Sequence, residues 1–439
     1  MLKTLVGAFK NKDIRKKILY TLMILVIVRV GSLLPIPGVD TEYFSSLLSG
    51  INTGDLSYLS AFTGGSFERM SLFALSITPY ITSSIIMQLL AIAIPKLEEM
   101  QKEGEDGRKK IAAITRYVTI ALALIESIAM AVGFGRSGLI KGYQGFSTLH
   151  YIVSIIVVVA ALTAGSAMLM WLGERITENG VGNGISIVLL INIISGMPSD
   201  FATLYSTFVA PRTIAKGVLA AAIIIAILVV MVVLVCFLQD GERRIPVQYS
   251  QKVSGRKTFG GQSTNIPLKV NTAGVMPVIF ASSLMQFPVI IAQLFGKSYE
   301  WTRYLSSSYW CRISAPKYSI GLILYIVLLI ILAYFYTSIT FNPIEVADNL
   351  KKAGGVIPGI TPGKSTSDYL NNILNYIVFV GAVGLLIIAL IPIMCTGFFN
   401  ASVSFGGTSV IIIVGVVLET LKQIESQMVN RYYKGFLSE

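Results

Sequence analysis

The chain has 439 residues, of which 54% are hydrophobic and only 13% are charged, and its mean hydropathy is +0.72. This composition excludes an ordinary soluble domain and predicts an all-α polytopic membrane protein. The formal net charge of +12 predicts contact with anionic partners, such as lipid head groups or ribosomal RNA.

The N-terminal segment, residues 1–17, is basic and amphipathic, and no small-residue cleavage site follows it. It predicts an interfacial helix that is retained, and a cleaved signal peptide is the alternative. A helix needs roughly 17 to 25 apolar residues to cross a bilayer. Ten candidate spans follow, of which the fifth is short and glycine-rich: 18–34, 70–94, 111–133, 149–172, 182–197, 213–238, 270–295, 318–340, 371–392 and 400–421.

The distribution of positive charge predicts the orientation of these spans. Segments on the side of the N-terminus hold 24 of the 35 Lys and Arg residues, and the alternate loops hold 7. Because cytoplasmic loops retain positive charge, both termini are predicted to be cytoplasmic, including the tail at 422–439. Ten spans divide into two five-helix halves, 18–212 and 213–421. Since five is odd, the second half enters from the opposite face, as in an inverted repeat around a central path.

Two predicted cytoplasmic loops are long and charged. Loop 239–269 alternates polar and β-forming residues around Gly260 and Gly261, which predicts a hairpin in the cytosol. Loop 341–370 predicts a short helix followed by proline and glycine turns. Loops of this size typically dock a partner.

The sequence predicts no enzyme, no cofactor and no metal site. The stretch GITPGKST at 359–366 ends like a phosphate-binding loop, but three residues separate its glycines where the motif has four. The three cysteines have no paired spacing, and His150, at the start of a span, is interpreted as interfacial. Ionisable residues within the spans are few, which disfavours an ion-coupled transporter. A secondary transporter of a small solute nevertheless stays the alternative function.

The span 70–94 carries more hydroxyl groups than a helix packed only against lipid requires. Ile77, Ile81, Ser84 and Gln88 follow one another at spacings of three or four, so they share one stripe of a helix. Two bulky aliphatic residues are therefore followed by polar groups toward the cytosol. The alternative is that the hydroxyls bond back to their own helix and Gln88 bonds to a neighbour.

Six stretches of the sequence, in chain order, form a specific combination. They are IPGVD (36–40), FALSITPYITSSIIMQLL (73–90), WLGERITENGVGNGISIVL (171–189), IPLKVNTAGVMPVIFASSL (266–284), FNPIEVADNLKKAGGVIPGI (341–360) and SFGGTSVIIIVGVVLET (404–420). Together they closely resemble the SecY family, whose members form the channel of the bacterial Sec protein translocon. The resemblance implies a passive channel in the cytoplasmic membrane, which passes unfolded polypeptides across and releases membrane spans laterally into lipid.

The resemblance also implies roles for particular residues. An aliphatic pore ring is expected from Ile77, Ile81, Ile185, Leu189, Ile279 and Ile412. A plug at 52–67 is expected to include Leu56, Tyr58, Leu59, Phe62, Gly64 and Gly65. A lateral gate between the second and seventh spans is expected from Ser83, Ser84, Gln88, Ser282, Ser283 and Gln286. Partner docking is expected from Arg243, Arg244, Lys252, Arg256, Lys257, Lys351, Lys352 and Lys364.

The partners implied by the resemblance lie on both sides of the channel and within the membrane. They are small membrane subunits similar to SecE and SecG, the motor ATPase SecA or the ribosome on the cytoplasmic face, secretory and membrane protein substrates, and anionic lipids. Bacterial relatives usually carry arginine before the last Pro-Gly of PGITPG, where this chain has Thr361. A positive contact for the motor is therefore expected to be missing here or to be supplied by another residue, such as Lys364.

Overall fold

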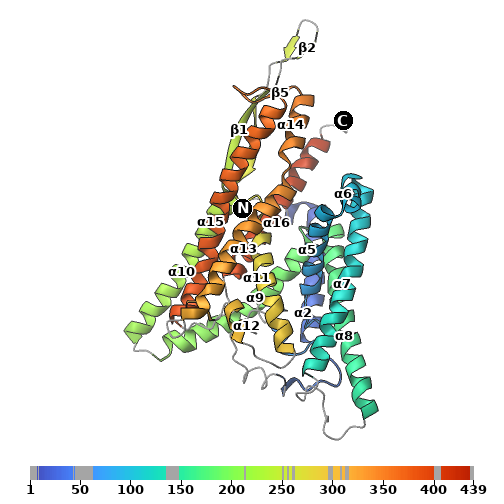
Figure 1. Cartoon of the computed structure of the whole chain (residues 1–439), viewed down its shortest axis with the longest axis vertical. Coiled ribbons are helices and arrows are strands. Elements are labelled where there is room, and N and C mark those ends of the chain that lie inside the picture. Colours follow the sequence, from blue (N-terminus) through green and yellow to red (C-terminus); the bar gives the residue numbers. More distant parts are fainter. Residues whose placement is uncertain are drawn as a thin grey trace.

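The computed structural model is a bundle of long helices with a small β-sheet at one end (Figure 1). It describes residues 7, 9–42, 44, 63–134, 148–211, 214–249, 252–254, 257–259, 263–294, 300–306, 309–311, 316–399 and 407–435. The long helices are α2 (Lys12–Leu33), α5 (Thr78–Ala93), α7 (Glu105–Phe134), α8 (Thr148–Asn179), α9 (Gly184–Leu204), α10 (Ile214–Asp240), α11 (Met276–Leu294), α13 (Ile320–Thr340), α15 (Lys364–Phe399) and α16 (Gly407–Gly435). Shorter helices are α6 (Pro95–Lys102), the π-helix η3 (Tyr205–Val209), α12 (Glu300–Leu305), the 3₁₀-helix η5 (Pro316–Ser319) and α14 (Pro343–Lys352).

Each of the ten predicted spans falls on one of the long helices. Within the described residues, six helices are long and apolar enough to cross a membrane: α7, α8, α9 with η3, α10, α13 and α15. The pair α5 and α6, bent by 106°, gives a seventh if it is counted as one span. Of the others, α2 and α16 have charged ends, and α11 has 19 residues. The chain is an all-α polytopic membrane protein, and the inverted relation of its halves stays a prediction.

The span predicted at 70–94 is only partly helical. Residues 71–77 form turns and a bridge, and α5 begins at Thr78 with Pro79 in its first turn. Proline is favoured there because its fixed φ suits the helix and its missing N–H has no partner in the first turn. The expectation that Ile77 lies within a continuous helix is therefore wrong, since Ile77 is the N-cap residue of α5.

Two other boundaries differ from the sequence-based prediction. The fifth span was expected to end near residue 197, but α9 continues through Pro198 to Leu204 and then into η3. Residues 12–17, predicted to lie in a separate interfacial helix, form the first turns of α2. Asn11 caps that helix, because its side chain accepts a hydrogen bond from the backbone N–H of Asp13 at 3.2 Å.

The two predicted cytoplasmic loops form one structural unit. Strand β1 (Glu242–Tyr249) pairs antiparallel with β4 (Ser263–Lys269) on one side and with β5 (Gly355–Val356) on the other. Ile245 and Val247 of β1 pack inward with a buried cluster that also contains Leu268, Leu350, Ile357, Leu370, Ile373 and Ile377. The first loop and the second loop therefore share a hydrophobic core at the top of Figure 1.

The predicted hairpin in loop 239–269 is confirmed, but its turn was assigned to the wrong glycines. Strand β2 (Lys252–Ser254) pairs with β3 (Lys257–Phe259), and Ser254 lies opposite Lys257. The two strands are thus joined through residues 255–256, and Gly260 and Gly261 follow β3 on the return toward β4. These connecting residues lie outside the described part of the chain.

Candidate functional site

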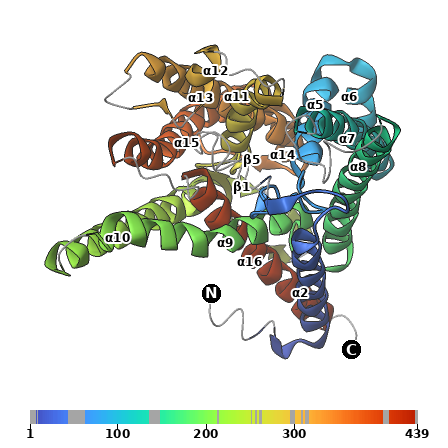
Figure 2. The same ribbon diagram turned by 90° about the horizontal axis from the view of Figure 1, so that it is seen from below.

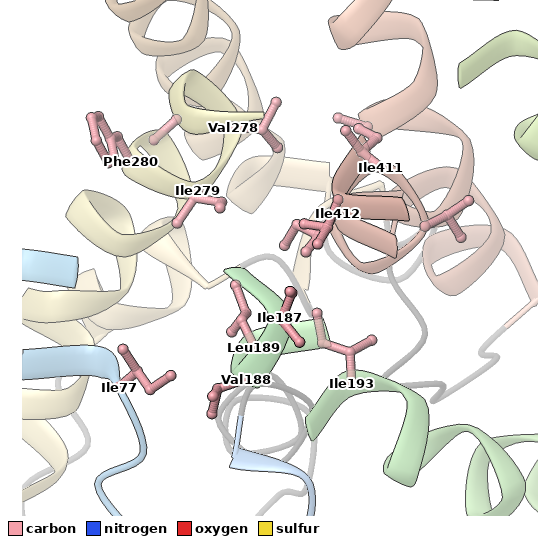
Figure 3. Close-up of a cluster of buried hydrophobic side chains, with 14 of the residues drawn as sticks. Ile77, Ile187, Val188, Leu189, Ile193, Val278, Ile279, Phe280, Ile411 and Ile412 are labelled. Carbon is pink, nitrogen blue, oxygen red and sulfur yellow. The ribbon is translucent and has the colours of Figure 1, made fainter. Parts of the chain in front are cut away.

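Four aliphatic side chains from four different elements meet in the centre of the bundle (Figure 3). We call these residues the waist: Ile77 at the start of α5, Leu189 on α9, Ile279 on α11 and Ile412 on α16. Their exposed fractions are only 1%, 5%, 6% and 1%. They were all predicted for the pore ring, and the structure places them in one hydrophobic cluster. Two of them come from each half of the chain.

The other two predicted ring residues lie at the edge of this cluster. Ile81 and Ile185 are half-buried and pack against it. Ile185 is in the first turn of α9, where a Cβ on Gly173 of α8 would lie 3.1 Å from its Cγ1 atom. Ile185 therefore lies one turn before Leu189, toward the end of α8.

Several buried residues beside the waist were not predicted from the sequence. They are Ile187, Val188 and Ile193 of α9, Val278 and Phe280 of α11, and Ile411 of α16 (Figure 3). The run ISIVLLINIIS has aliphatic residues on every side of the helix, so its periodicity does not select a single inward apolar face. Only the packing of α9 between neighbouring helices determines which of its side chains reach the centre.

The backbone before Ile77 is held in an unusual conformation by buried polar contacts. Ser76 has a φ of +53°, in the left-handed region that a non-glycine residue rarely adopts. Its hydroxyl accepts a hydrogen bond from the Asn192 side-chain amide at 3.1 Å, and its carbonyl accepts one from the Ser166 hydroxyl at 3.5 Å. Segment 66–76 is thereby tied to α8 and α9, and this fixes the position of Ile77.

Close backbone approach supports the same segment. Gly165 of α8 lies against the carbonyl group of Leu72, and Gly31 of α2 lies against the ring of Phe73. A Cβ atom at either glycine would collide with these groups. Glycine is required at these positions because the helices approach the turn segment too closely for a side chain.

The structure separates the predicted gate serines into two groups. The hydroxyl of Ser83 is fully buried and lies 2.6 Å from that of Thr119 on α7. Ser83 therefore faces α7, and this contradicts the expectation that it faces the gate. Ser282 is also buried, donates to the Val278 carbonyl at 2.8 Å and lies beside Tyr325 of α13. It too faces its own half of the bundle.

The remaining gate candidates are less buried than Ser83 and Ser282. Ser84, Gln88 and Ser283 are half-buried, and Gln88 donates to the Ser84 hydroxyl at 3.4 Å. The side chain of Gln286 lies outside the described part of the structure.

Helix α11 contacts α7 on one side of the bundle, and α16 contacts α9 on the other. Figure 2 shows α9 and α10 across the bundle from α11 and α13. The halves thus meet along two separate seams.

Only the end of the predicted plug can be located. Leu56, Tyr58, Leu59 and Phe62 lie outside the described residues. Gly64 and Gly65 follow them in a turn, with φ values of +62° and +79°. The Ser195 hydroxyl of α9 donates to the Gly64 carbonyl at 3.4 Å, so this turn packs against α9.

The described basic residues of the predicted docking surface lie around the sheet. Arg243, Arg244, Lys351, Lys352 and Lys364 are exposed. Arg244 forms an ion pair of 2.6 Å with Glu242, so its charge is partly neutralised. The side chains of Lys252 and Lys257, and all of Arg256, lie outside the described residues.

Taken together, this geometry defines a class of protein: a polytopic helical membrane protein whose two halves meet at a buried aliphatic cluster. The profile of the SecY family matches residues 71–421. A protein translocase subunit SecY from Streptomyces galbus is 44% identical over 446 residues, with 100% of each chain covered. The chain therefore belongs to the SecY family.

Solved structures agree with this fold at low sequence identity. One was described in a study of the plug domain of the SecY protein, which stabilises the closed state and maintains a membrane seal in that channel. It has a TM-score of 0.63, 18% identity, and coverage of 94% of this chain and 92% of that chain. The Sec61 channel of a canine ribosome–channel complex has a TM-score of 0.60, 18% identity, and coverage of 94% and 93%.

Proposed function

We propose that the chain is the central channel subunit of a Sec translocon in a bacterial cytoplasmic membrane, with both termini in the cytosol. It passes unfolded polypeptides across the membrane and releases membrane spans laterally into lipid. The waist is the observation that carries this proposal, because it joins both halves of the chain through aliphatic side chains alone. An apolar constriction resists wetting, and it can fit around a passing polypeptide without binding it.

The cytoplasmic sheet supports a docking role for the two loops. Their shared core holds β1 and α14 together, and exposed cations surround that core. A positive surface suits ribosomal RNA or acidic groups on a motor such as SecA. Basic cytoplasmic segments also suit anionic lipids. Subunits similar to SecE and SecG would brace the two halves from within the membrane.

Cysteine cross-linking tests the channel directly. In a variant whose three native cysteines are replaced by serine, Ile77→Cys or Ile279→Cys is expected to form an adduct with a stalled secretory chain that carries one cysteine. The reason is that a polypeptide in transit must touch the waist. A matched cysteine at Val218, which is 65% exposed on α10, is expected to give no adduct. Absence of an adduct at both waist positions would favour the small-solute transporter.

The gate residues make a second prediction. Gln88→Leu removes a half-buried amide from the predicted lateral gate and is expected to change which signal sequences are accepted, since a polar group lowers the cost of wetting a seam that opens. Ser83→Ala is the control, because Ser83 faces α7 and its loss is expected to affect helix packing without changing selectivity. Export of signal sequences of graded hydrophobicity measures both. Equal selectivity in Gln88→Leu and the unmodified chain would contradict the assignment.

A further inference from the structure

An aromatic and cationic unit covers the ends of α11 and α13 that lie away from the sheet (Figure 1). We call it the cap; it consists of α12, residues 309–311 and η5. Trp310 forms its core, with an exposed fraction of 2% and an indole N–H that donates to the Tyr304 carbonyl at 2.8 Å. The rings of Tyr304 and Tyr318 lie edge to face at 5.0 Å between centroids. The cap is therefore packed well enough to hold surface groups in place.

Two cations on the cap lie beside one tyrosine. Arg303 and Lys317 are both exposed, and each is close enough to Tyr318 to interact with its hydroxyl group. The guanidinium carbon of Arg303 lies 5.9 Å from the ring centroid of Tyr309, and the Lys317 ammonium lies 5.0 Å from that of Tyr318. Glu300 is the nearby acid that faces both cations. Among the described residues, no ion pair joins Glu300 to either.

The position of this charge is unusual for the chain. Loop 296–317 holds 4 of the 7 Lys and Arg residues on the predicted outer side. Positive charge is disfavoured in short outer loops, so the general charge bias of a membrane protein does not account for these cations. Two neighbouring cations also repel each other, and the single acid that faces them, Glu300, compensates only one of the two positive charges.

An apolar stripe continues directly from the cations along α13. Ile320, Ile323, Leu324 and Val327 have exposed fractions of 64%, 62%, 50% and 47%, and they follow one another at helical spacing. A stripe of this kind on a membrane-spanning helix faces lipid tails. Lys317 precedes the first of these residues by less than one turn. The cations and the apolar stripe therefore follow each other in the same order as the head group and the acyl chains of a lipid.

We propose that Arg303, Lys317 and the Tyr318 hydroxyl bind the phosphodiester of an anionic membrane lipid whose acyl chains lie along α13. The planar guanidinium can donate two parallel hydrogen bonds to phosphate oxygens, while the lysine ammonium supplies a compact charge. The Tyr318 hydroxyl supplies a further donor between them. This site is separate from the waist and from the cytoplasmic docking surface. It holds whether or not the proposed channel function is correct.

Lipid quenching of tryptophan fluorescence tests the site on the full chain. Trp301 is 46% exposed and belongs to α12, next to Arg303, so it reports on lipid at the cap. Trp171→Phe removes the other exposed tryptophan, and buried Trp310 contributes the same background throughout. In vesicles, phosphatidylglycerol with brominated acyl chains is expected to quench Trp301 at a lower mole fraction than brominated phosphatidylcholine.

Charge substitutions decide whether the cap causes this preference. Arg303→Gln and Lys317→Gln are each expected to lower the preference roughly fivefold, while Arg303→Lys retains most of it. Lys216→Gln, which removes an exposed lysine from the first turn of α10, is expected to change nothing. Unchanged thermal unfolding establishes that the variants are folded, since both cap cations are exposed. Equal quenching by the two lipids, or an equal loss in Lys216→Gln, would overturn the proposal. So would cross-linking of Lys317 to an acidic peptide without any lipid preference.

Discussion

Replacing Ile279 and Ile412 together with asparagine is expected to make the resting membrane leak ions. Both side chains are almost completely buried in the waist, on α11 and α16. An amide at this position is desolvated without a partner and gains roughly 2 kcal/mol or more from water that enters the constriction. A change of this size raises the wetted population by about tenfold or more, because 1.4 kcal/mol corresponds to a factor of ten. Conductance across planar bilayers that contain the purified channel measures the leak.

A volume-conserving control separates polarity from packing in this experiment. Leucine at both positions keeps the apolar volume, and such exchanges typically cost less than about 1.5 kcal/mol. The leucine variant is therefore expected to stay as tight as the unmodified chain. Export of proteins with defective signal sequences is expected to rise only in the asparagine variant. If the two variants leak equally, the waist does not form the seal.

The sequence predicted the helical framework well because spans that face lipid are encoded by local composition. Every one of the ten predicted spans overlaps a long helix. The apolar runs of α10 and α13 show the physical reason most clearly. Their side chains must be apolar on all lipid-facing sides, whatever the rest of the fold is. Such segments are predictable without knowledge of their neighbours.

The start of α5 was not predictable from hydropathy, because turns buried in protein are as apolar as a span. Some backbone groups of residues 71–77 form hydrogen bonds with other segments of the chain. For example, the Leu72 N–H donates to the Leu34 carbonyl at 2.9 Å. Pro79, in the first turn of α5, is a local signal for a helix start. Whether such a proline begins a helix or kinks one depends on tertiary contacts.

The candidate site was only partly predictable, because the direction of a side chain also depends on tertiary contacts. The pore-ring residues came from family resemblance; four of the six are buried in one cluster, and Ile81 and Ile185 pack against its edge. The gate serines shared a helix and a polar character, yet Ser83 bonds to α7 and Ser84 does not. Adjacent residues on a helix point about 100° apart, so residue type alone does not assign the face. The union of the two cytoplasmic loops through β1 and β5 depends on long-range pairing, which local patterns do not contain.

Gly165→Ala and Gly196→Ala are expected to change stability in opposite directions. A methyl group at Gly165 would collide with the Leu72 carbonyl, which is backbone and has little freedom to move. Overpacking of this kind typically costs about 1–3 kcal/mol. A methyl group at Gly196, within α9, meets nothing within 4 Å. Alanine is favoured over glycine in a helix by roughly 0.5–1 kcal/mol, so Gly196→Ala is expected to be neutral or stabilising.

Gly165→Ala is also expected to affect the seal, because Gly165 supports the segment that precedes Ile77. Displacing segment 66–76 from α8 strains the contacts of Ser76 with Asn192 and Ser166, and these contacts place Ile77 at the waist. Gly165→Ala is therefore expected to lower the thermal unfolding midpoint in detergent and also to increase ion leakage, whereas Gly196→Ala leaves the seal intact. Leakage without loss of stability would mean that the turn segment moves independently of the bundle. Loss of stability with a tight seal would show that Ile77 keeps its place without the support of α8.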